Sequence, residues 1–117
     1  MGSALRATVI TVSDEVASGG DENRSGPIAV AELEIQGLQA ELVVVADEAD
    51  AIRAAITAAI QGGSRVVITS GGTGIGPTDR TVDAVAPLLS YQLPGLAEEI
   101  RRRGAEHVSA ALVSREV

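Results

Sequence analysis

A glycine-rich segment, "SGGTGIGPTDRT" at positions 70–81, contains the residues of this sequence that are best suited to chemistry. Its four glycines would cost roughly 2 to 4 kcal/mol in the interior of a helix or strand, so the segment is expected to form a loop. Without a Cβ atom, such a loop lets backbone N–H groups approach an anion or a polar ring closely. We predict a ligand-binding loop, with a purely structural glycine turn as the alternative.

Two common glycine motifs do not fit this segment. A phosphate-binding P-loop requires a lysine, and the chain contains none. The dinucleotide fingerprint G-x-G-x-x-G fails because Pro77 occupies the third glycine position when counting from Gly72. The segment also follows the third expected strand, whereas the dinucleotide motif follows the first. Both observations argue against a dinucleotide site of the Rossmann type.

Aspartates accompany the ends of three expected strands, with Asp14 after the first, Asp47 after the second and Asp79 beyond the third. Magnesium is held in proteins through one or two carboxylates together with substrate phosphates. If the three side chains share one edge of a sheet, they predict phosphoryl or nucleotidyl transfer. The alternatives are solvated surface charges and, for Asp79, capping of the helix that follows or pairing with its dipole.

The basic residues carry weaker signals. Arg24 and Arg80 are candidates for contacts with phosphate oxygens, or else are solvated loop charges. The arginines at positions 101–103 belong to the last turn of a helix, where they complement the helix dipole. His107 lies beyond that helix and is expected at the surface.

The elements that position these residues follow from periodicity and turn signals. Apolar, β-branched runs predict strands at 5–12, 40–47 and 65–70, and the last of these reads as buried on both faces. Helices are predicted from Pro27 to the stop at Gly37, over the apolar stripe that runs from 52 to about 62, from 81 onwards, and at 96–103 before Gly104. Pro87 should kink or divide the third helix. The tail "ALVSREV" begins like another strand.

Strands that alternate with helices predict an α/β fold with a parallel sheet covered on both faces. In a doubly wound order, the carboxyl ends of the first and third strands lie side by side at a switch point, where ligands bind. The loops that leave these two strands are 13–26 and 70–79, the least regular polar segments of the chain. A ligand site is therefore expected between them.

Composition narrows the class of protein further. A net charge of −7 and a single aromatic residue argue against binding to nucleic acid or to anionic lipid surfaces. Cysteine is absent, which excludes disulfides and thiolate chemistry and fits the cytoplasm. No apolar run approaches the roughly 20 residues that cross a bilayer. We expect a soluble cytoplasmic protein, and residues 1–3 are left out of the fold prediction because they resemble an expression remnant.

Four ordered motifs together resemble the molybdopterin-binding family of molybdenum cofactor biosynthesis, which includes molybdopterin adenylyltransferases and the related domain of gephyrin. They are "TVSD", "RSGP", "VVITSGGTGIGPTDRT" and "LPGLAEEIR". The resemblance covers about residues 8–115 and implies one domain over residues 1–117. It also implies a three-layer α/β/α sandwich with a mostly parallel sheet, assembled as a homotrimer.

Active members of that family use Mg²⁺ and ATP to adenylylate the terminal phosphate of molybdopterin, releasing pyrophosphate, and the resemblance implies this reaction here. It implies Asp47 and Asp79 as catalytic residues and as the candidate metal ligands. The implied ligand-binding residues are Ser13, Asp14, Ser25, Ser70, Gly71, Gly72, Thr73 and Gly74. A paralogue or scaffold that binds the pterin without converting it is the alternative.

The sequence departs from the family pattern at several places. Asn23 stands where many relatives have aspartate, Ala46 replaces a frequent proline, and Pro87 falls in a helix that relatives keep regular. Relatives continue beyond the "LVSREV" segment through another strand, an "NLPGSP"-like loop and a last helix. The resemblance therefore predicts that the 117 residues lack these last elements.

Overall fold

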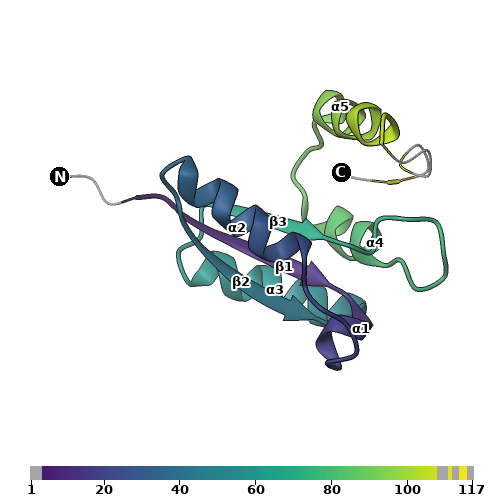
Figure 1. Ribbon diagram of the computed structural model, residues 1–117, viewed down its shortest axis with the longest axis horizontal. Coiled ribbons are helices and arrows are strands. Elements are labelled where there is room, and N and C mark those ends of the chain that lie inside the picture. Colours follow the sequence, from purple (N-terminus) through teal and green to yellow (C-terminus); the bar gives the residue numbers. More distant parts are fainter. Residues whose placement is uncertain (1–3, 108–110, 112–113, 116–117) are drawn as a thin grey trace.

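The computed structural model describes residues 4–107, 111 and 114–115. Strands alternate with helices along this part of the chain (Figure 1). In chain order the elements are β1 (Arg6–Val12), α1 (Asp14–Ala17), α2 (Ser25–Ile35), β2 (Gln39–Val45), α3 (Ala49–Gln61), β3 (Val66–Ser70), α4 (Thr81–Val85), the 3₁₀ helix η1 (Ala86–Leu88) and α5 (Pro94–Ala105).

The three strands form one parallel sheet in the order β2-β1-β3. Val12 of β1 pairs with Val45 of β2, and Thr11 pairs with Ser70 of β3, so all three strands end at the same edge. This order places the loops after β1 and β3 next to each other, as the doubly wound topology predicts.

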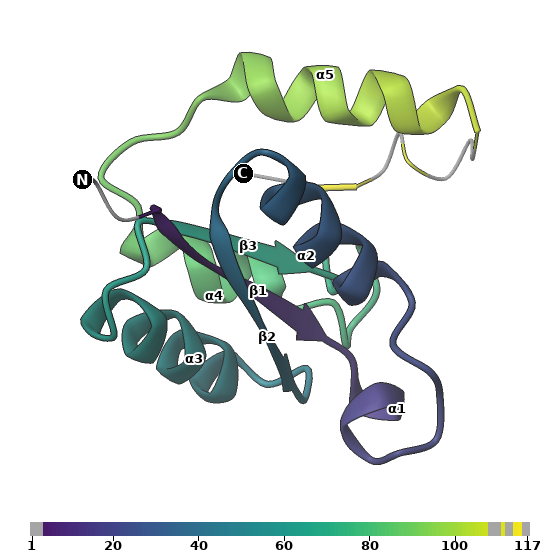
Figure 2. The same ribbon diagram turned by 60° about the vertical axis from the view of Figure 1, so that its left-hand side comes forward.

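Helices cover both faces of the sheet (Figures 1 and 2). On one face α3 and α4 pack together and enclose the buried core, which consists of Ile10, Val12, Ile52, Ile56 and Ala84. On the other face α2 lies against β1 and β2. The predicted α/β fold with a parallel sheet and helices on both sides is confirmed.

The start of α2 approaches the sheet very closely at Gly26. A Cβ atom there would lie 2.7 Å from both the Leu42 side chain and the Thr11 hydroxyl. Asn23, just before the helix, accepts hydrogen bonds from the Gly26 N–H at 3.2 Å and from the Thr11 hydroxyl at 3.3 Å. These contacts hold the "RSGP" segment against the end of β1.

Three expectations about the elements need correction. The strand at 65–70 is not buried on both faces: β3 flanks the central strand β1, and its Ile68 is 37% exposed. The polar segment 13–26 is not all loop, because Ser13 caps the short helix α1 by accepting the Val16 N–H. The last helix passes through Gly104 and ends at Ala105. Division of the helix at Pro87 is confirmed, since α4 gives way to η1 there.

Beyond α5 the chain returns to the glycine segment. Arg101 of α5 donates to the Ser114 carbonyl at 3.2 Å, and the Arg115 backbone N–H donates to the Thr73 carbonyl at 2.7 Å. The strand predicted to begin in "ALVSREV" falls largely on residues outside the described ones.

Candidate functional site

The glycine loop requires glycine at its first two positions. Gly71 and Gly72 have φ angles of +101° and +66°, which side chains disfavour. A Cβ atom on Gly71 would overlap the Val12 carbonyl oxygen, and one on Gly72 would overlap the Thr81 hydroxyl. The loop therefore leaves β3 by passing directly against the end of β1.

Thr81, the first residue of α4, ties the end of the loop to its beginning. Its hydroxyl donates to the Gly71 carbonyl at 2.7 Å, and its backbone N–H donates to the Gly72 carbonyl at 3.0 Å. Thr81 is 2% exposed, so both bonds are shielded from water. The segment 71–81 is thereby closed into a ring.

Asp79 lies inside this ring. Its carboxylate accepts the Gly76 N–H at 3.0 Å, and a Cβ atom on Gly74 would lie 2.6 Å from the same oxygen. The N-cap residue of α4 is Arg80, which makes no side-chain capping bond. The capping alternative for Asp79 is therefore wrong, and its carboxylate lies against the glycines.

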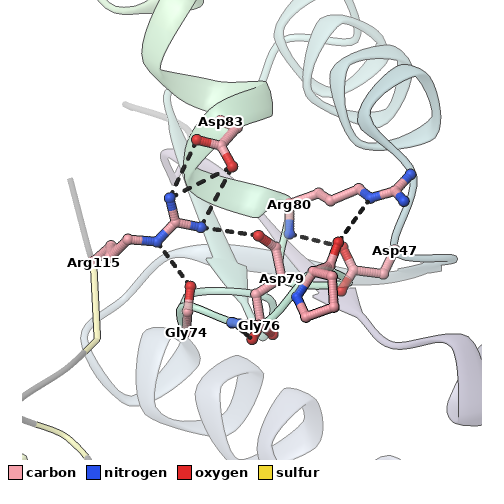
Figure 3. Close-up of polar contacts among 8 residues, drawn as sticks. Asp47, Gly74, Gly76, Asp79, Arg80, Asp83 and Arg115 are labelled. Atoms are coloured by element: carbon pink, nitrogen blue, oxygen red, sulfur yellow. Dashed lines mark hydrogen bonds and ion pairs between the residues drawn. The ribbon is translucent and has the colours of Figure 1, made fainter.

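Asp47 reaches the same loop from the end of β2 (Figure 3). Its carboxylate accepts the Arg80 N–H at 3.2 Å, and its own N–H donates to the Asp14 carboxylate at 2.8 Å. A Cβ atom on Gly72 would lie 3.3 Å from the Asp47 carboxylate. A side chain at position 72 would therefore crowd the Asp47 carboxylate, and glycine avoids this.

Partial burial raises the pKa of Asp47 above its ordinary value of 3.8. The charges of Asp14 and Asp79 raise the pKa further, while the hydrogen bond from the Arg80 N–H lowers it. Asp14 and Asp79 therefore lie near enough to Asp47 for their charges to affect its ionisation. In the described part of the chain, however, no group of three or more acidic, histidine or cysteine side chains is arranged to hold a metal ion.

A hollow of about 360 Å³, which we name the serine hollow, opens between the loops after β1 and β3. Its lining includes four of the predicted ligand-binding residues together with neighbours of both charges: Ser13, Ser25, Ser70, Gly71, Asp21, Glu22, Asn23 and Arg24. The hydroxyls of Ser25 and Ser70 are hydrogen-bonded at 3.2 Å, which joins α2 to the end of β3. The switch point of the sheet is therefore a hollow lined mostly by residues with polar side chains.

A second hollow of about 470 Å³, which we name the arginine hollow, lies beside the later part of the loop, residues 75–80. Its lining includes Asp79 and the three arginines Arg53, Arg80 and Arg115. The Arg80 side chain donates one long bond, from Nε to the Pro77 carbonyl at 3.5 Å. Arg53 donates its Nε to the Ala84 carbonyl at 3.1 Å, and one of its terminal nitrogens lies 3.8 Å from the exposed carboxylate of Asp50. In both side chains the Nε atom is engaged by a carbonyl, so the terminal nitrogens are the donors that could meet an anion.

Not every predicted ligand residue turns toward these hollows. Thr73 lines a separate, mainly apolar hollow between β3, α4 and α5, and its hydroxyl accepts a bond from Ser114 at 2.9 Å. The Gly74 carbonyl is bonded to Arg115. The sequence patterns did not identify Arg53 or Arg115 as site residues. For Arg115, its place in the "LVSREV" segment was a signal that could have been used.

The structure is a parallel α/β domain whose glycine loop lies beside the serine hollow and contacts the carboxylates of Asp47 and Asp79. This arrangement at the strand ends is typical of α/β domains that bind ligands. The family model described as a probable molybdopterin binding domain matches residues 8–117, so the chain belongs to that family.

Curated relatives agree with this assignment. The chain is 46% identical over 110 residues to a molybdenum cofactor biosynthesis bifunctional protein of Synechococcus elongatus, covering 93% of this chain and 34% of that protein. It is 38% identical over 105 residues to a molybdopterin adenylyltransferase of Pyrococcus furiosus, covering 90% of this chain and 62% of that enzyme. The chain thus spans between a third and two thirds of the length of these two relatives.

Solved structures share the fold. The molybdopterin biosynthesis Mog protein from Mycobacterium ulcerans superposes with a TM-score of 0.88 at 39% identity, covering 96% of this chain and 74% of that one. The tungsten cofactor synthesizing protein MoaB from Pyrococcus furiosus gives 0.87 at 33% identity, covering 98% and 72%. Among the described residues, no helix combines the length and apolar character needed to cross a membrane.

Proposed function

We propose that this chain acts in molybdenum cofactor biosynthesis by transferring AMP from ATP to the terminal phosphate of molybdopterin. The observation that carries the proposal is that Asp47, which follows β2, and Asp79, which precedes α4, contact the same glycine loop, and that this loop lines both hollows. A relative that is 38% identical is named molybdopterin adenylyltransferase, which supports the proposal.

Each hollow suits one substrate. In our proposal molybdopterin occupies the serine hollow, where the hydroxyls of Ser25 and Ser70 meet polar atoms of the pterin and the loop amides meet its phosphate. The phosphates of ATP extend into the arginine hollow, toward Arg53 and Arg80. Local cations of this kind are needed because the chain as a whole carries a charge of −7 and repels anions.

The carboxylates fit a magnesium ion that arrives with its nucleotide. Magnesium is usually held by one or two carboxylates together with phosphate oxygens. Asp47 and Asp79 would supply the two carboxylates, and ATP the phosphate oxygens. Mutual repulsion among the aspartates, which contributes to the raised pKa of Asp47, favours a cation beside them. When bound, the ion would neutralise phosphate charge that develops during transfer.

The chain's own contribution to the reaction is to position both substrates. An oxygen of the molybdopterin phosphate forms a bond to the α-phosphorus of ATP, and the bond from that phosphorus to the bridging oxygen breaks. Pyrophosphate leaves with the bonding electrons, in line with the attacking oxygen. Loop amides hold the attacking phosphate while the arginine hollow holds the leaving group, so the reacting atoms are brought into line.

Incubation with molybdopterin and Mg-ATP tests the proposal. We expect adenylylated molybdopterin and pyrophosphate in equal amounts. A chain that binds molybdopterin tightly and forms neither product would instead be a pterin-binding paralogue or scaffold, and the enzyme proposal would fail.

We also propose that the protein is a cytoplasmic homotrimer, as its resemblance to the family implies. Light scattering should then give a mass of three times the 11.9 kDa of one chain. A monomer at assay concentrations would remove this part of the proposal.

A further inference from the structure

The side chain of Arg115 lies against the glycine loop, between Gly74, Asp79 and Asp83 (Figure 3). Its Nε donates to the Gly74 carbonyl at 2.8 Å, and one terminal nitrogen donates to the Asp79 carbonyl at 2.9 Å. One guanidinium therefore holds the backbone on both sides of the turn that carries the Asp79 carboxylate.

Within that turn the backbone and the carboxylate hold each other. The Asp79 N–H donates to the Gly76 carbonyl at 3.1 Å, and the Gly76 N–H donates to the Asp79 carboxylate at 3.0 Å. The direction of the carboxylate therefore depends on the shape of the turn. A planar guanidinium with donors at fixed angles can set the separation of two carbonyls, whereas a lysine ammonium acts as a point charge.

Arg115 also pairs with Asp83 of α4, with nitrogen–oxygen distances of 3.2 to 3.5 Å. The Asp83 side chain is 68% exposed and that of Arg115 is 34% exposed. Ion pairs this accessible to water contribute little to stability. The bonds to the two loop carbonyls are therefore the contacts through which Arg115 affects the loop.

We propose that Arg115 is a positioning residue that fixes the glycine loop and directs the Asp79 carboxylate. It does not touch the reacting atoms. Its importance for catalysis rests on the proposed role of Asp79 in AMP transfer, whereas its effect on the loop does not.

The anchoring of the tail is separable from the guanidinium. The Arg115 N–H donates to the Thr73 carbonyl at 2.7 Å, and the Ser114 hydroxyl donates to the Thr73 hydroxyl at 2.9 Å. The first contact is available to any residue except proline at position 115, and the second does not involve that residue. Side-chain variants are therefore expected to keep the tail in place and to change only the guanidinium contacts.

Amide hydrogen exchange of the whole chain tests the loop effect in Arg115→Lys, Arg115→Gln and Asp83→Asn. We expect exchange at Gly76 and Asp79 to accelerate about tenfold or more in both Arg115 variants, with less than about threefold change in β1. Asp83→Asn removes the ion pair and keeps the carbonyl bonds, so its loop should exchange within about threefold of the wild type. Unchanged exchange in either Arg115 variant, or equal acceleration in Asp83→Asn, would overturn the proposal.

Kinetics provide the second readout. If the chain transfers AMP, Arg115→Lys should lower kcat about tenfold or more while KM for ATP changes less than about threefold. A rise in KM with unchanged kcat would show that Arg115 binds the nucleotide instead. If the wild type forms no product, the proposed function fails, and the exchange measurement still decides the role of Arg115 in the loop.

Discussion

Arg80 donates its backbone N–H to the carboxylate of Asp47 over 3.2 Å, although the two residues are 33 positions apart. Asp47 follows β2 and Arg80 precedes α4, and the strands β2 and β3 lie on opposite sides of β1. The bond therefore crosses the end of the central strand. It couples the position of the Asp47 carboxylate to the end of the glycine loop.

Replacement of Asp79 by asparagine should separate catalysis from binding. The asparagine oxygen can still accept the Gly76 N–H, so the loop should keep its shape. We expect kcat for AMP transfer to fall about 100-fold or more, as when one electrostatic contact to a transition state is lost. Affinity for molybdopterin, measured by calorimetry, should change little. The control is Glu34→Gln on the exposed surface of α2, which also removes one negative charge.

Asp47→Asn should make the protein more stable and less active. Because the pKa of Asp47 is raised in the fold, the folded chain holds this proton more tightly than the unfolded chain does. The fold therefore loses stability as the pH rises from the ordinary value of 3.8 through the raised pKa. At pH 7 we expect the variant to gain less than about 1 kcal/mol.

The pH dependence distinguishes this explanation from a general effect of the substitution. Denaturant unfolding of both proteins should show the advantage of Asp47→Asn decreasing as the pH falls, and disappearing below the unfolded carboxyl pKa. An advantage that stays constant down to acidic pH would contradict the electrostatic explanation.

Gly72→Ala should be strongly destabilising. The new Cβ atom would require a disfavoured φ of +66° and would collide with the Thr81 hydroxyl, so we expect a loss of about 2 to 4 kcal/mol. Gly95→Ala, near the start of α5, is the matched control, since nothing lies within 4 Å of its added Cβ atom. That variant should be neutral or stabilised by up to about 1 kcal/mol. Equal losses in thermal unfolding would be incompatible with the described loop.

Thr81→Val tests the closure of the ring. Valine has nearly the same shape but cannot donate to the buried Gly71 carbonyl, which should cost about 1 to 3 kcal/mol. Thr81→Ser keeps the hydroxyl and loses only a methyl group, which should cost about 1 kcal/mol. Urea unfolding of both variants is the measurement, and a less stable serine variant would argue against the hydrogen bond.

Much of this arrangement follows from local sequence. The three strands and their carboxyl-terminal loops were predictable because β-branched runs end at turn-forming residues, and the parallel order then brings Asp47 and the glycine loop to one edge. The position of Ser25 and Ser70 in one hollow follows from the same order.

The rest depends on contacts between distant residues. Arg115 meets Gly74 across 41 positions, and Arg53 enters the arginine hollow through the packing of α3 on α4. Periodicity and turn chemistry carry no information about such pairs. The exposure of β3 was also mispredicted, because an apolar run does not reveal whether a strand is central or at an edge of the sheet.

The most direct measurement is a crystal structure of Asp79→Asn with molybdopterin and Mg-ATP bound. We predict the pterin in the serine hollow, with its terminal phosphate oxygen about 3 to 3.5 Å from the α-phosphorus of ATP, beside Asp47. The ATP phosphates should reach Arg53 and Arg80. Ligands bound away from the glycine loop, with Asp47 contacting neither, would contradict this prediction.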